Sequence, residues 1–301
     1  MIRAIRHAGV AALLSVLGAR LAGAQPATAV DLRVMSVNVR VGSAPDGENQ
    51  WERRKAILAD TILRYNPDLL GTQEALDYQV EFLAQELKGH TAFGAGRDDG
   101  QRRGEHVAIF YRADRFDVLE SGHYWLSPQP DSPGTIGWDA AVPRMVSWLK
   151  LRVRGTEGPT ILFQNTQWDA KGVKARTEAA KAIRALMIRK GRDAVHLLTG
   201  DFNVERDSEP FGVLASVRDG GQPLFDTYRR FRPEPGKEEG TVHDFSGKRN
   251  QKRYDWILCS SGFTVKDAAI DRSNVSGRYP SHHFPVTAVL RLEVVGTPKP
   301  D

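Results

Sequence analysis

The sequence predicts one domain of the α+β class, extending over residues 30–293. Between residues 31 and 87 the apolar residues follow the order strand, helix, strand, helix. Further along, pairs of alternating segments predict additional strands. The chain has 301 residues, of which 41% are hydrophobic, so it can bury a large core, and no repeat or composition break divides it.

The first half of the chain supplies the clearest elements. Residues 31–40 alternate between two faces, as a strand does. Residues 50–66 carry apolar side chains at spacings of seven, four and three, and Asn66-Pro67 ends this predicted helix. A short apolar strand is expected at 68–71, and helical spacing returns at 76–87.

The second half is richer in strands. Segments 107–111 and 116–119 predict a strand pair around a turn at Ala113-Asp114, and 146–153 with 160–166 predict another. Between the pairs, residues 124–145 are rich in Pro, Gly and Trp and predict a long functional loop. The remaining expectations are a helix at 172–190, strands at 195–200, 254–259 and 284–292, and a loose tail at 294–301.

The first 24 residues have the pattern of a secretory signal peptide. Arg3 and Arg6 precede the apolar run Val10–Leu17, and Ala22-Gly23-Ala24 offers small residues for cleavage. A membrane anchor is the alternative, but the run is shorter than the roughly 20 residues that a span needs. We therefore expect a periplasmic or secreted protein with no transmembrane span after signal removal.

The mature chain carries little net charge. The formal net charge of +5 falls to +2 when the three arginines of the signal segment are removed. Binding to a long polyanion depends on many positive charges, so we expect no stable binding to duplex nucleic acid. We also expect a monomer.

Polar residues follow the predicted buried strand at 195–200. Gly200 ends the apolar run, and Asp201 and Asn203 then lie two positions apart, which places them on one face of extended backbone. An isolated Asp-x-Asn of this kind is more often a simple turn. Its companions at other strand ends favour a site.

These companions are amide, carboxylate and imidazole groups at predicted strand ends. Such ligands suit Mg²⁺, which uses one or two protein carboxylates and fills its shell with water and substrate phosphate. Zinc is less supported, because neither His-Glu-x-x-His nor Cys-x-x-Cys occurs. Hydrolysis of a phosphate ester is the chemistry that this set would perform best. Its members are Asn38, Glu74, Asn165, Asp201, Asn203, Asp255, His282 and His283.

The motifs that carry these residues together resemble the endonuclease/exonuclease/phosphatase family, in order and over nearly the whole mature chain. That resemblance implies a DNase I-like fold, a four-layer α/β/β/α sandwich with two mixed β-sheets. The motifs are Ser36–Arg40, Gln73-Glu74, Val107–Arg112, Gly137–Asp139 with Pro143-Arg144, Asn165-Thr166, Thr199–Asn203, Tyr254–Ile257 and Ser281–Val286.

The resemblance also implies roles. Glu74 matches the family's metal ligand, with Asn38 beside it on the metal or the phosphate. Asp201 matches the residue that positions or deprotonates the attacking water, and Asn203 one that holds the phosphate. His283 would contact the phosphate or act as base, supported by Asp255.

Other matched positions would line the site. Tyr111, Arg144 and Asn165 are expected to bind substrate, and an arginine could hold a phosphate oxygen. The implied cofactor is Mg²⁺ or Mn²⁺, acting on charge that develops at phosphate during in-line attack by water.

Two motifs depart from the family pattern. Gln167 and Ala170 stand where the family usually has histidines, and glutamine cannot protonate a leaving group. His282 replaces an aspartate in the usual Ser-Asp-His. As a metal ligand, the imidazole favours Mn²⁺ or another transition ion over Mg²⁺. An active metal-dependent phosphoesterase and a degenerate member that binds a phosphorylated ligand with little turnover both remain open.

The substrate class is open as well. Nucleic acid, a nucleotide, and a lipid or inositol headgroup all fit, because loops that the sequence does not decode select the substrate. Trp125, Trp138 and Trp168 near the expected cleft could stack on a base or a sugar.

Overall fold

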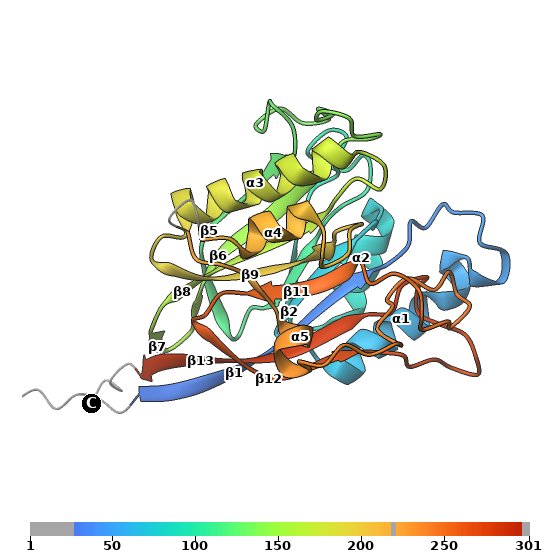
Figure 1. Ribbon diagram of the computed structural model, residues 1–301. Coiled ribbons are helices and arrows are strands. Elements are labelled where there is room, and N and C mark those ends of the chain that lie inside the picture. Colours follow the sequence, from blue (N-terminus) through green and yellow to red (C-terminus); the bar gives the residue numbers. More distant parts are fainter. Residues whose placement is uncertain (1–26, 218–220, 297–301) are drawn as a thin grey trace, which may run out of the picture.

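The computed structural model describes residues 27–217 and 221–296. They form a seven-stranded and a six-stranded β-sheet, which pack face to face. The first sheet has the order β12-β13-β1-β2-β4-β3, and β7 pairs with β13. The second has the order β10-β11-β9-β8-β6-β5. Helices cover the outer faces, and the α+β, DNase I-like four-layer fold expected from the sequence is confirmed (Figure 1).

The elements have the following bounds. The strands of the first sheet are β1 (Ala27–Asn38), β2 (Leu69–Gln73), β3 (His90–Phe93), β4 (Ile109–Arg112), β7 (Thr156–Glu157), β12 (Phe263–Ile270) and β13 (Val286–Gly296). Those of the second are β5 (Phe116–Trp125), β6 (Met145–Val153), β8 (Thr160–Gln167), β9 (Ala194–Asp201), β10 (Phe225–Asp226) and β11 (Asp255–Cys259). The helices are η1 (Gly47–Asn49), α1 (Trp51–Tyr65), α2 (Asp77–Glu86), α3 (Val173–Lys190), α4 (Glu209–Ala215) and α5 (Thr227–Phe231).

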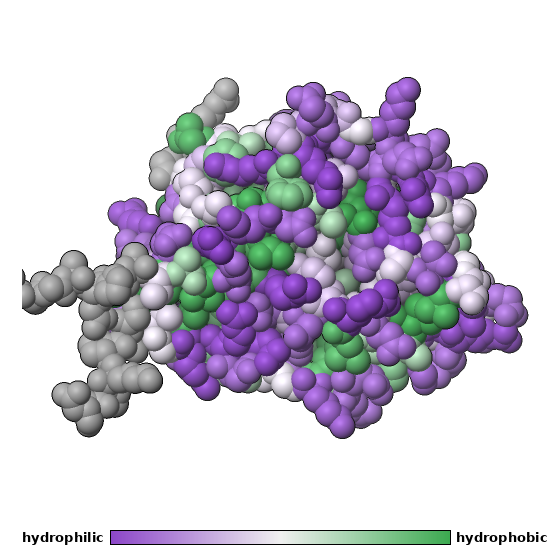
Figure 2. Space-filling model, turned by 90° about the horizontal axis from the view of Figure 1, so that it is seen from below, coloured by the Kyte–Doolittle hydropathy of each residue, from purple (hydrophilic) through white to green (hydrophobic). Residues whose placement is uncertain are grey.

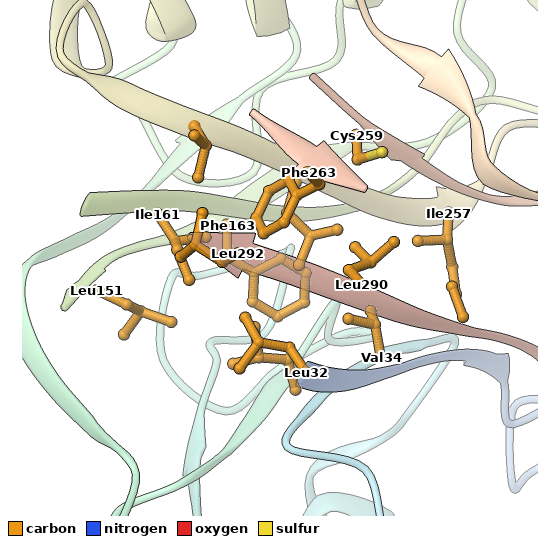
Figure 3. Close-up of a cluster of buried hydrophobic side chains, with 14 of the residues drawn as sticks. Leu32, Val34, Leu151, Ile161, Phe163, Ile257, Cys259, Phe263, Leu290 and Leu292 are labelled. Atoms are coloured by element: carbon orange, nitrogen blue, oxygen red, sulfur yellow. The ribbon is translucent and has the colours of Figure 1, made fainter. Parts of the chain in front are cut away.

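Three hydrophobic clusters hold the four layers together. The largest lies between the sheets and joins Leu32 and Leu290 of the first to Phe163 and Ile257 of the second (Figure 3). A second cluster packs α3 and α4 on the outer face of the second sheet, and a third packs α1 and α2 on the first. Burial of this apolar surface is the main stabilising term of the fold.

The surface has the opposite character. The face drawn in Figure 2 is largely hydrophilic, with hydrophobic residues in separate small patches. Among the described residues, no helix has the length and apolar character that crossing a membrane requires. The predicted signal peptide, residues 1–24, lies outside the described residues.

Several elements differ from the sequence prediction. The strands β3, β7, β10 and β12 and the helices α4 and α5 fall in segments for which no element was expected. Pairing also extends past both predicted domain bounds, because β1 begins at Ala27 and β13 continues to Gly296. Residues 294–296 are therefore strand and not tail, held between β1 and β7.

Strand direction brings the polar residues to one end of the sandwich. β1 and β2 are parallel, with Asn38 opposite Gln73, and β8 and β9 are parallel, with Gln167 opposite Asp201. β11 is antiparallel to β9, so its first residue, Asp255, pairs with Asp201. Carboxyl ends of parallel strands share an edge, and this edge carries the candidate site.

Candidate active site

Two carboxylates at this edge are joined by two side-chain amides. Nδ2 of Asn38 donates to Oε1 of Glu74 at 2.8 Å and to Oδ2 of Asp201 at 3.1 Å. Nε2 of Gln167 makes the same pair of contacts, at 2.9 and 3.1 Å. The amide donors thus offset the repulsion between two negative groups that come from different sheets.

The backbone is unusual at both sides of this arrangement. Glu74 has φ +62° and Asn203 has φ +50°, in the left-handed region that non-glycine residues seldom adopt. At Glu74 the turn lets Oε2 accept from the backbone N–H of Val41 at 3.2 Å. Local strain of this kind is typical of functional sites.

Asp201 is 2% exposed at the end of β9. Burial, and then the charge of Asp255, raise the pKa of Asp201 to about 6, although His283 and the hydrogen bond from Gln167 oppose this. The carboxylate is therefore basic enough to accept a proton and is ionised in a large fraction of molecules near neutral pH.

His283 and Asp255 form a buried ion pair next to Asp201. Nδ1 of His283 lies 2.8 Å from Oδ2 of Asp255. Burial alone would lower the pKa of His283, but the charge of Asp255 and this hydrogen bond outweigh it and raise the pKa to about 9. The imidazole is thus held as a cation at neutral pH, with Nδ1 committed to Asp255 and Nε2 left to act elsewhere.

His282 faces Glu74 from the other side. Its Nε2 lies 3.9 Å from Oε1 of Glu74, and its Nδ1 lies 3.4 Å from the Ser281 hydroxyl. That hydroxyl donates to the carbonyl of Asn38, so it accepts from Nδ1 and leaves a lone pair on Nε2 toward Glu74. Burial and the neighbouring His283 hold the pKa of His282 well below its usual value, which keeps the ring neutral.

The residues present fit a divalent cation. Ligand atoms of Asp201, Asp255 and His283 all lie within 4.8 Å of one another, and of these the two carboxylates can bind a cation without the prior loss of a proton from the His283 imidazolium. Oδ1 of Asp255 is buried and has no hydrogen-bond partner among the described residues, which is costly for a carboxylate without a cation. Glu74 and His282 supply a further carboxylate and a free imidazole nitrogen at the same edge.

Asn38 directs its amide nitrogen toward the carboxylates of the site. Its Oδ1 accepts from the backbone N–H of Arg40 at 2.9 Å, so the amide nitrogen, which cannot bind a metal, faces the carboxylates. Coordination of the metal by Asn38 stays a prediction. In this arrangement Asn38 positions Glu74 and Asp201.

Asn203 takes part in a local turn and also lies beside Asp201 in the site. Its backbone N–H donates to Oδ1 of Asp201 at 3.2 Å, which is the local turn that an Asp-x-Asn sequence favours. Its Nδ2 donates to the carbonyl of Trp168 at 2.9 Å, which fixes the side chain beside Asp201. One N–H of the amide stays available for a substrate oxygen.

Arg144 is held behind Gln167. Its Nη1 donates to Oε1 of Gln167 at 2.7 Å, and its Nε lies 3.4 Å from Oδ2 of Asp169. The Asp169 carboxylate also accepts from the backbone N–H of Gly172, which precedes α3. The side chain is 12% exposed. Arg144 therefore fixes the amide of Gln167 with its nitrogen toward the two carboxylates, which makes it a positioning residue in this arrangement. Binding of phosphate by Arg144 stays a prediction.

Two expected substrate-binding residues lie elsewhere. Tyr111 packs against the core between the sheets, because β4 is antiparallel to β2 and its carboxyl end, opposite Leu69, points to the far edge. Asn165 is fully buried and joins the sheets: Nδ2 donates to the carbonyls of Thr72 and Ala108, while Oδ1 accepts from Gln73 and Thr199. All its hydrogen-bonding capacity is used, so no group is left for substrate.

The expected tryptophan stacking surface is also reduced. Trp168 is completely buried and Trp125 is 5% exposed, each within a hydrophobic cluster. Trp138 alone of the three is partly exposed, in the loop before β6.

The sequence interpretation missed Arg54. This α1 side chain is 1% exposed and donates to the carbonyls of Val39 at 2.7 Å, Pro280 at 3.0 Å and Arg40 at 3.1 Å. It thereby ties the loop after β1 to the segment that carries Ser281, His282 and His283. A charged residue within a predicted amphipathic helix gives no sequence signal that separates such a buried anchor from a solvent-exposed charge.

Comparison with known proteins shows the family of the chain. A model of the Endonuclease/Exonuclease/phosphatase family matches residues 35–277. A solved endonuclease/exonuclease/phosphatase from Bacteroides vulgatus is 31% identical with a TM-score of 0.81, covering 88% of this chain and 100% of that one. The mannosyl-6-phosphatase of Bacteroides thetaiotaomicron is 34% identical with a TM-score of 0.76, covering 86% and 99%.

A curated relative matches only in part. The Carbon catabolite repressor protein 4 homolog 3 of Arabidopsis thaliana is 30% identical over 172 residues, which is 56% of this chain and 36% of that protein. This chain thus spans about a third of that relative, whereas the family model covers most of this chain. The chain belongs to the endonuclease/exonuclease/phosphatase family.

Proposed function

We propose that the chain is a divalent-metal-dependent phosphoesterase that hydrolyses a phosphate ester by in-line attack of water. The observation that carries the proposal is the convergence of Glu74, Asp201 and the His283–Asp255 pair, from four strand ends, in one buried cluster. Family members that act on phosphate esters, such as the mannosyl-6-phosphatase, support the reaction type.

Each residue of the cluster has a separate role in the proposed hydrolysis. Asp201, with its pKa raised to about 6, accepts a proton from the attacking water. The His283 imidazolium, held by Asp255, presents Nε2–H to a phosphate oxygen. Asn203 and Gln167 orient their amide donors at the same edge. When bound, the cation supplies positive charge that stabilises the negative charge developing on phosphate.

The cation itself is proposed to be Mn²⁺ or another transition ion in preference to Mg²⁺. Glu74 and His282 would hold it, with Asp201 and Asp255 close by. An imidazole nitrogen is a softer ligand than the carboxylate oxygen usual in the family, and it favours transition ions over Mg²⁺.

The substrate proposal is a phosphomonoester of a sugar. It is supported by the mannosyl-6-phosphatase, which this chain covers almost completely. The low net charge of the mature chain supports the further proposal that duplex nucleic acid is not a substrate. An exported, monomeric protein stays a prediction, which fractionation and size-exclusion chromatography would test.

The test is hydrolysis of a sugar phosphate, a generic diester and DNA with Mg²⁺ or Mn²⁺, by the wild type and by Glu74→Gln. We expect metal-dependent release of phosphate that Glu74→Gln lowers by about 100-fold or more, since it removes a charge from the metal site. Asn250→Leu, at an exposed asparagine, serves as the control. Equal low rates in wild type and Glu74→Gln would instead support a degenerate member that binds phosphorylated ligands without turnover.

A further inference from the structure

A cavity of about 280 Å³ lies between α4, β10 and α5, outside the catalytic cluster. Its floor is apolar and includes Phe211 of α4, Phe225 of β10 and Leu224, which directly precedes β10. Its rim carries Arg206, Arg229 and Arg230. A concave apolar floor with a few charged groups at its rim is the usual character of a small-molecule site.

The charges at this rim are only partly balanced. Arg229 is paired with Glu239, and Asp226, the one acid among the described residues that line the cavity, is paired with Arg253. Arg206 and Arg230 have no ion-pair partner within residues 27–217 and 221–296. Two positive charges therefore stay uncompensated at the mouth of the cavity, and an anion would complement them.

Both free guanidinium groups lie over aromatic rings of the floor. Arg230 is 4.4 Å from the ring centroid of Phe225, and Arg206 is 5.7 Å from that of Phe211. Contact with a ring restrains a guanidinium without using its in-plane N–H donors. The two arginines are thus partly preorganised, with donors free for a planar or tetrahedral anion.

We propose that this arginine pocket, defined by Arg206, Phe211, Leu224, Phe225 and Arg230, binds an organic phosphate, with the ring or apolar body of the ligand on the floor and its phosphate between the two arginines. The proposal does not require the hydrolytic function, since none of these residues belongs to the catalytic cluster.

The location offers two sources for such a ligand. A second cavity, of about 500 Å³, shares Arg206 with the arginine pocket, shares Arg229 with the rest of the 280 Å³ cavity, and is also lined by Glu205 and Arg253. Those two residues lie two positions from Asn203 and Asp255 in the catalytic cluster. The phosphate could therefore belong to the far end of an extended substrate or to a separate effector.

Binding of phenylphosphonate, which has no hydrolysable ester, measured by titration calorimetry tests the proposal. We expect binding to the wild type and to Glu74→Gln, weakened at least tenfold in Arg206→Gln/Arg230→Gln. The control Arg152→Gln/Lys174→Gln also removes two exposed positive charges and should bind as the wild type does. All four positions are exposed, and unfolding curves would verify that the folds are intact.

Unchanged affinity in Arg206→Gln/Arg230→Gln, or no binding to the wild type at millimolar phenylphosphonate, would overturn the proposal. Loss of binding in Glu74→Gln alone would also overturn it, because the probe would then occupy the catalytic cluster. Competitive inhibition of sugar phosphate hydrolysis would assign the pocket to the far end of the substrate, and non-competitive inhibition to an effector. If Glu74→Gln hydrolysed the sugar phosphate as fast as the wild type, the proposed function would be refuted, but the proposal that the arginine pocket binds an organic phosphate would not be affected.

Discussion

Replacing Arg144 with methionine tests whether Gln167 works only when its amide is held in one orientation. The substitution keeps an unbranched side chain but removes the 2.7 Å hydrogen bond to Oε1 of Gln167. Asp169 loses its arginine partner yet still accepts from the backbone N–H groups of Ala141, Lys171 and Gly172. We therefore expect a catalytic effect with only a modest loss of stability.

The size of the effect follows from the bond that is lost. A hydrogen bond to a charged group contributes roughly 1.5–3 kcal/mol, which corresponds to about a 10- to 150-fold lower kcat if the orientation is needed in the transition state. In addition, an unrestrained amide can turn its oxygen toward Glu74 and Asp201, where it repels both carboxylates.

Steady-state hydrolysis of a sugar phosphate with Mn²⁺ would measure this loss, with Arg152→Met as a matched control at an exposed arginine. If Arg144 acts through Gln167, its substitution should change little in a Gln167→Ala background. A folded Arg144→Met protein with a kcat within twofold of the wild type, or effects of the two substitutions that simply add, would refute this role of Arg144.

Three other consequences are measurable. His282→Asp should raise the affinity for Mg²⁺ relative to Mn²⁺ by calorimetry, and an unchanged ratio would argue against His282 as a ligand. Asn165→Leu removes four buried hydrogen bonds, three of which join the two sheets, and should lower the free energy of unfolding in urea by about 3–5 kcal/mol, against almost no change for Asn250→Leu. Burial lowers the pKa of His123 and His196 to about 4. The folded state thus favours their neutral forms, and their contribution, at most about 3 kcal/mol each, is complete above pH 6.5 and lost as the pH falls through 4. Urea titrations across that range would show no such slope if the two rings were already charged.

The parts of the fold that were predicted from the sequence are those with several repeats of one period. Helices α1 and α3 each offer four or five turns, and the sequence of β1 alternates from Asp31 onward. In contrast, α5 has 5 residues, too few to display a helical period. β12 contains a register shift between Val265 and Asp267, which interrupts the alternation.

The candidate site shows the same division. Glu74, Asp201 and Asp255 were predicted because strand ends and family motifs mark them, and strand pairing confirms that Asp201 and Asp255 are neighbours. Asn165 lies on the same strand face as Gln167 but two residues earlier, which moves it from the open edge into the gap between the sheets. Whether the hydrogen-bonding groups of such a side chain are used by other protein groups depends on the opposite sheet. No sequence pattern within one strand contains that information.

The central claim is that Glu74 and its neighbours form one site for a divalent cation and a phosphoryl group. An anomalous difference map from crystals soaked in Mn²⁺ and phosphate tests it most directly. We predict one strong peak beside the Glu74 carboxylate, with phosphate density between that peak and His283. A map without a peak at Glu74, or with its strong peaks only on distant surface carboxylates, would show that Glu74 and its neighbours do not form this site.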